Sequence, residues 1–107
     1  MRINTDKKYY VISLKHTKPG DRFITLWGPN DTGYFYNRHQ AGIYEGYDTG
    51  YHDSGSMPVE VSDLESLFVY SPAGQGHESG FKLPNRNSTW NKIGHLLVRG
   101  KLVKIQE

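Results

Sequence analysis

The sequence predicts an α+β fold, in which an antiparallel β-sheet of four to six strands carries two short helices packed on one face. Between residues 9 and 38, three short segments rich in β-branched and aromatic residues are separated by two clusters of turn-forming residues. Two later segments carry apolar residues at helical spacing. The chain also has 12 glycines and 5 prolines, a composition typical of a small domain with many turns.

Length and composition restrict the class of protein. The 107 residues are enough for a single domain with a modest core. The sequence has no cysteine, no apolar run of membrane-spanning length and no apolar stretch near its start, so we expect a cytoplasmic protein without disulfides. The net charge of +2 is too small to indicate binding to nucleic acid. The eight tyrosines suggest a homo-oligomer or a bound ligand that buries their rings, although tyrosines also pack at the edges of small β domains.

The first half of the chain is expected to form strands. After a flexible arm over residues 1–7, we predict strands over residues 8–16, 22–27 and 34–38, and a short fourth strand near 43–47. Alternation along the first three strands gives an aliphatic core face and an opposite face that carries aromatic rings, lysine, arginine and hydroxyl groups. The second face suits a planar, negatively charged ligand if it is open to solvent.

The second half of the chain is expected to contain both helices. Ser62 and Glu65 have the spacing of a capping box at the start of the first helix. Residues 71–80 are polar and rich in glycine, which predicts a flexible loop.

The second helix is predicted to begin at Asn87 or Ser88, because asparagine and serine are favoured N-cap residues. We expect it to continue to Gly100, since Trp90, Ile93 and Leu97 would share one helical face. A final strand over residues 102–105 either returns to the sheet or docks as a tail.

Candidate ligand-binding residues are aromatic, cationic or amide side chains near strand ends, turns and helix starts. Stacking of a base on an aromatic ring is worth roughly 1–3 kcal/mol, and lysine and arginine bind phosphate oxygens. The alternatives are a solvated strand end for the lysine and histidine, a small internal core for the rings, a cap on the sheet edge for Arg38, and capping of the second helix for one of the asparagines near its start. The predicted set is Lys15, His16, Trp27, Asn30, Tyr34, Tyr36, Arg38, Asn85 and Arg86.

Catalysis has little support in the sequence. His52, Asp53 and Glu60 could act as a base and its partners, as in small β-rich ribonucleases, but no spacing enforces this arrangement. The five histidines lack the spacing of a metal site. We therefore expect a protein that is not an enzyme and that uses neither a cofactor nor a metal.

Three stretches of the sequence resemble a family of small, functionally uncharacterised proteins encoded by bacteriophages and prophages. These stretches are YYVISLKHT, TLWGPNDTGY and AGIY, and Pro58-Val59 and Leu83-Pro84-Asn85 followed by Trp90 add to the likeness. Small phage proteins without enzymatic motifs often counteract host defences. The resemblance thus implies a protein of the host cytoplasm that sequesters an immune signalling nucleotide or, alternatively, inhibits a host defence protein directly.

Overall fold

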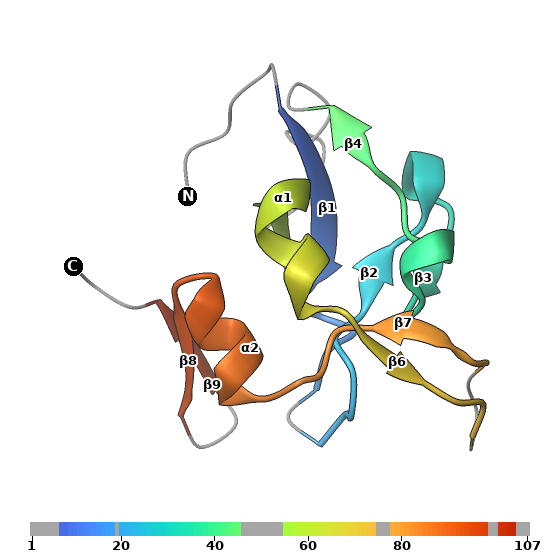
Figure 1. Ribbon diagram of the computed structural model, residues 1–107. Coiled ribbons are helices and arrows are strands. Elements are labelled where there is room, and N and C mark those ends of the chain that lie inside the picture. The colour runs from blue at the N-terminus through green and yellow to red at the C-terminus, as the bar shows by residue number, and fades with distance from the viewer. Residues whose placement is uncertain (1–6, 19, 46–54, 75–77, 99–100, 105–107) are drawn as a thin grey trace.

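The computed structural model describes residues 7–18, 20–45, 55–74, 78–98 and 101–104 (Figure 1), with the backbone alone for residues 31, 96–98 and 101–104. Most of the arm predicted over residues 1–7 and the centre of the loop predicted over 71–80 lie outside these ranges. No helix in the described part of the chain is both long and apolar enough to cross a membrane.

Strand β1 is the centre of a five-stranded antiparallel sheet, which confirms the predicted α+β class. Strand β5 pairs with β1 along one edge, β2 and β4 share its other edge, and β3 pairs with β2. The N-terminal meander was therefore predicted correctly, but its strands are shorter than those predicted over residues 8–16, 22–27 and 34–38. The strands are β1 (Lys8–Ser13), β2 (Leu26–Trp27), β3 (Tyr34–Phe35), β4 (Tyr44–Glu45) and β5 (Ser56–Glu60). Two 3₁₀ turns, η1 (Pro29–Asp31) and η2 (Arg38–Gln40), flank β3.

Both helices contribute to one hydrophobic core on one face of this sheet. Helix α1 (Val61–Leu64) continues into the 3₁₀ turn η4 (Glu65–Leu67) and packs on β1 and β5 (Figure 1). Helix α2 (Asn87–Lys92) places Trp90 in the same core. As the alternation predicted, Tyr10 and Ile12 of β1 face this core. Its buried residues are Tyr10, Ile12, Ile24, Leu26, Val59, Leu64, Phe68, Leu83 and Trp90.

Two short hairpins accompany the central sheet in the described ranges (Figure 1). Strands β6 (Val69–Ser71) and β7 (Gly80–Lys82) form one, and β8 (His95–Val98) and β9 (Lys101–Lys104) form the other. The segment after the β6–β7 hairpin contains Pro84. An isolated β-bridge joins Pro84 to Phe23, which lies near the start of the second predicted strand.

Helix α1 begins two residues earlier than predicted. Its N-cap is Glu60, and no side chain caps it, so the capping box expected from Ser62 and Glu65 is wrong. Ser62 lies inside the first turn because the helix follows directly from β5.

Helix α2 is shorter than predicted, since it ends at Lys92 rather than near Gly100. Gly94 has a φ angle of 83°, a left-handed conformation that ends helices and that glycine adopts at little cost. The next residues, predicted to be helical, form β8, and the predicted last strand pairs with β8 instead of the central sheet. The N-cap of α2 is Arg86, not Asn87 or Ser88.

Candidate ligand-binding site

The face of β1 expected to carry an open ligand surface is buried. Tyr9, Val11 and Ser13 are at most 2% exposed, so β1 is covered on both sides. The aromatic face predicted from alternation reaches the surface in β3, where Tyr34 is 42% exposed.

Three predicted site residues form a stack of rings beside β1. The His16 and Tyr34 rings lie 3.7 Å apart between centroids and are nearly parallel, and Trp27 lies 4.6 Å from Tyr34 in a tilted arrangement. Trp27 and Tyr34 are direct partners across β2 and β3, and the Trp27 indole N–H donates to the Ser56 hydroxyl at 3.0 Å. Because these rings contact one another, a ligand would stack on the outside of this group.

The turn that carries Lys15 and His16 is held by hydrogen bonds. Ser13 Oγ accepts the His16 backbone N–H at 3.3 Å and lies 2.9 Å from its Nδ1. The Thr17 hydroxyl donates to the Ser13 carbonyl at 2.8 Å and accepts from the Thr25 N–H at 2.9 Å. A side chain at Gly55 would contact the Lys15 stem at 2.5 Å. The structure thus gathers Lys15, His16, Trp27 and Tyr34 at one end of the sheet.

Arg38 lies away from this group and interacts with its own surroundings. Its Nη1 is 3.3 Å from the Glu65 carboxylate, and its Cζ is 4.9 Å from the centre of the Phe81 ring. Glu65 also accepts the Tyr10 hydroxyl at 3.3 Å. Burial, with the Glu65 carboxylate as a second cause, raises the pKa of Tyr10 to about 12. Arg38 is therefore part of a structural ion pair.

Two further predicted residues are dispersed. Tyr36 is half-buried and its ring lies 5.7 Å from that of Phe23. Asn30 is exposed in η1, where its φ angle of 54° matches the left-handed conformation that asparagine tolerates. The sequence pattern explains the turn at Asn30 better than a role in binding.

Asn85 connects three parts of the chain. Its amide N–H groups donate to the Lys18 and Asp21 carbonyls, both at 3.0 Å, and its Oδ1 accepts the Trp90 indole N–H at 2.8 Å. The amide donors are thus already used, and Asn85 positions the neighbouring residues instead of binding a ligand through its side chain.

The groove beside Asn85 contains two arginines and is called the arginine groove below. It has a volume of about 450 Å³. Within the described ranges, neither Arg22 nor Arg86 has a carboxylate partner. The Arg22 guanidinium lies 5.6 Å from the Phe23 ring, and Tyr70 is 61% exposed. The lining residues, none of which is acidic, are Arg22, Phe23, Val69, Tyr70, Ser71, Pro72, Pro84, Asn85 and Arg86.

Long-range pairing brings the two arginines to one groove. Residue 23 bridges Pro84, and the Asn85 N–H donates to the Arg22 carbonyl at 2.9 Å. Strand β6 supplies the remaining lining residues through Tyr70 and its neighbours. Sequence reasoning found Asn85 and Arg86 but missed Arg22 and Tyr70. No local pattern marks these two residues.

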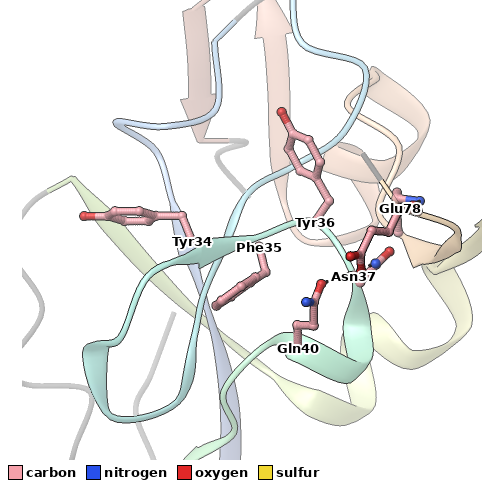
Figure 2. A pocket seen from close by; sticks show the side chains of 7 residues that line it. Tyr34, Phe35, Tyr36, Asn37, Gln40 and Glu78 are labelled. Atoms are coloured by element: carbon pink, nitrogen blue, oxygen red, sulfur yellow. Dashed lines mark hydrogen bonds between the residues drawn. The ribbon is translucent and has the colours of Figure 1, made fainter. Parts of the chain in front are cut away.

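A second hollow, of about 250 Å³, lies between β3, η2 and the β6–β7 hairpin (Figure 2). Figure 2 shows the side chains of Asn37, Gln40 and Glu78 close together, while Tyr34 and Phe35 point in different directions. The Asn37 amide donates to Gln40 Oε1 at 3.3 Å, and no hydrogen-bond donor in the described residues reaches Asn37 Oδ1.

The cation in the lining of the second hollow, Lys82, is not accessible to a ligand. Lys82 is fully buried, and its Nζ donates to the carbonyls of Ser71 and Glu78. Burial lowers the pKa of Lys82, an effect that the nearby Glu78 carboxylate opposes. With a buried ammonium and a carboxylate in its lining, this hollow suits an anion less well than the arginine groove does.

The structure describes only one of the three residues considered for a ribonuclease. His52 and Asp53 lie outside the described residues. Glu60 ends β5, and its carboxylate is 3.3 Å from Lys7 Nζ.

No protein family, curated protein or solved structure matches the chain. The candidate site therefore rests on the geometry and chemistry of its own residues.

Proposed function

We propose that this protein binds a planar ligand carrying phosphate groups, of the nucleotide class, and holds it without chemical turnover. The observation that carries the proposal is the arginine groove, whose lining combines an exposed tyrosine with two arginines that have no carboxylate partner among the described residues. Its volume of about 450 Å³ lies within the range usual for small-molecule sites.

The chemistry of the lining matches the two parts of such a ligand. Guanidinium groups bind phosphate through paired N–H donors and remain charged at any physiological pH. Arg22 is held near the Phe23 ring, so less of its conformational freedom is lost on binding. The exposed ring of Tyr70 offers a face on which a base can stack.

Binding without turnover agrees with the residues of the groove. Acid–base catalysis needs a positioned histidine, carboxylate or similar group, and the described lining contains neither histidine nor carboxylate. Sequestration of a host immune signal requires affinity alone. The resemblance to phage-encoded proteins supports this role in the bacterial cytoplasm. The exposed rings of Tyr34 and Phe81 support a homo-oligomer, because contact between copies of the chain would bury them.

The proposal is tested with a thermal-shift screen of linear and cyclic nucleotides, followed by calorimetry. A ligand at a hundred times its Kd should stabilise the protein by about 2.7 kcal/mol. Arg22→Gln and Arg86→Gln should each weaken binding by about tenfold to a hundredfold, because a charge-assisted hydrogen bond is lost. Lys92→Gln removes an exposed cation outside the groove and should leave the Kd unchanged. Absence of any stabilising nucleotide, or equal Kd values for all variants, contradicts the proposal.

A second candidate function is direct inhibition of a host defence protein. It is favoured by the exposed apolar side chains of the β6–β7 hairpin, where Val69, Tyr70 and Phe81 are 40%, 61% and 44% exposed. Tyrosine and arginine are frequent in interface hot spots. Phe81 does not line the arginine groove, although its ring packs edge-on against that of Tyr70 at 5.8 Å. Phe81→Ala should therefore abolish capture of a stoichiometric partner and weaken nucleotide binding less than Arg22→Gln does. Partner capture without any effect of nucleotides favours this second function.

A further inference from the structure

We infer that the arginine groove selects its ligand by the number of phosphate groups and not by the identity of the base. The inference rests on the proposed function of the groove. It follows from an imbalance among the hydrogen-bonding groups of the lining, which offers many free donors and few free acceptors.

The donors come from the two arginines. Each guanidinium has five N–H donors and no acceptor, and within the described ranges neither is neutralised by a carboxylate. Arg22 and Arg86 lie on chain segments that the Phe23–Pro84 bridge and the hydrogen bond from Asn85 N–H to Arg22 O hold together. Two positive charges in one groove favour a ligand with more than one negative charge.

The acceptors of the lining are largely occupied. Side chains that read a base edge are amides for adenine, carboxylates for cytosine and arginine for guanine. In this groove the arginines are the groups that the phosphates would engage, which leaves the amide of Asn85. The Asn85 side chain already binds Lys18 O, Asp21 O and the Trp90 indole. The carbonyls of Arg22 and Pro84 accept from Asn85 N–H and Arg86 N–H, at 2.9 and 3.1 Å.

The strand β6 side of the groove shows the same pattern. The Ser71 carbonyl accepts from Lys82 Nζ at 3.3 Å, and the Ser71 hydroxyl donates to the Pro72 carbonyl at 3.4 Å. The remaining lining residues are apolar or aromatic, and of these the exposed side chains of Tyr70 and Val69 and the exposed Pro72 are the surface that a base can reach. Stacking on such surfaces tolerates every base, since every base has a π face.

The amide and carboxylate groups that could read a base lie in a different place. Asn37, Gln40 and Glu78 line the second hollow (Figure 2), and none of them lines the arginine groove. The two hollows therefore differ in chemistry, and once the arginines bind phosphates the arginine groove has no carboxylate and no uncommitted amide side chain to read a base.

Calorimetry with two series of ligands tests the inference. The first series keeps one nucleoside and carries none, one, two or three phosphates, and we expect Kd to tighten at least about tenfold across it, as the charge-assisted bonds to two arginines are added. The second keeps three phosphates and exchanges the four bases, and Kd should vary by less than about tenfold. Arg86→Gln should flatten the first series and leave the second unchanged, while Lys92→Gln should alter neither.

The outcomes separate the inference from the function on which it rests. A nucleotide that binds in an Arg86-dependent manner, but with more than tenfold preference for one base at equal phosphate number, overturns the inference and retains nucleotide binding. Equal affinity for the nucleoside and its triphosphate also overturns the inference. If no member of either series binds, the proposed function itself fails.

Discussion

Asn85 acts at the scale of a single residue by joining the turn before Arg22 to helix α2. Trp90 is 2% exposed, and its indole N–H has Asn85 Oδ1 as its partner at 2.8 Å. In Asn85→Ala this donor remains buried without a partner, which costs about 1–3 kcal/mol. We expect the free energy of unfolding to fall by that amount in urea denaturation. Ser88→Ala, an exposed change in the same helix, should remain within about 0.5 kcal/mol of the wild type.

Gly80 is a second residue whose identity the structure requires. A Cβ at this position would lie 2.4 Å from Asn37 Oδ1 and 2.7 Å from its Cγ, and Asn37 is only 3% exposed. Gly80→Ala should therefore destabilise the protein by about 1–3 kcal/mol, measured as a lower midpoint of urea denaturation. Ser79→Ala alters the exposed neighbour and serves as the control. Equal midpoints for both variants would show that Asn37 can move aside.

The nine residues predicted to bind a ligand illustrate what sequence reasoning reaches. Trp27 and Tyr34 meet as predicted, because alternation in two adjacent strands places them on one face. Arg22 and Tyr70 were missed, because their proximity to Arg86 depends on pairing between distant segments. Local patterns carry no information about such pairing.

At the scale of the element, Lys82 makes the stability of strand β7 dependent on pH. Burial lowers the pKa of this amine in the folded state below its ordinary value of 10.5. Between the lowered value and 10.5 the unfolded chain binds more protons, so the free energy of unfolding rises with pH in this window. Below the window, Lys82 is charged in both states and the cost of its burial is fully present.

Replacement of Lys82 by methionine should remove this dependence. We expect the stability of Lys82→Met relative to the wild type to decrease as the pH rises from neutral towards 10, measured by urea denaturation at each pH. The series stays below 10.0, the ordinary pKa of tyrosine, because the raised pKa of Tyr10 lowers wild-type stability above it. Lys92→Met, at an exposed position, controls for the lost charge. A constant difference across the series contradicts the prediction.

Elements were predictable where one periodicity fitted the sequence. The strands around β1 follow from strict alternation between clear turns, and the start of α2 was found within two residues. The end of α2 was not predicted correctly, because Ile93 and Leu97 fit one face of a helix as well as they fit the alternation of a strand. The left-handed conformation of Gly94 decides between the two.

At the scale of the whole molecule, α2 and the central sheet share one core, and we expect them to unfold together. Trp27→Phe leaves Trp90 as the sole tryptophan of the chain, so its fluorescence reports on the docking of α2. In this variant, urea transitions followed by Trp90 fluorescence and by far-UV circular dichroism should have the same midpoint. A lower midpoint for fluorescence would mean that α2 separates first, which contradicts a single cooperative unit.

The position of β1 has a consequence for how the protein is made. Tyr9 precedes both of its sheet partners, Tyr44 and Glu60, by a long stretch of chain. During translation, the segment from Tyr9 to Ser13 leaves the ribosome before those partners emerge, and we expect its apolar side chains to remain exposed in the meantime. Completion of the sheet must wait for β5, so the slowest step of maturation is expected to be this distant strand pairing.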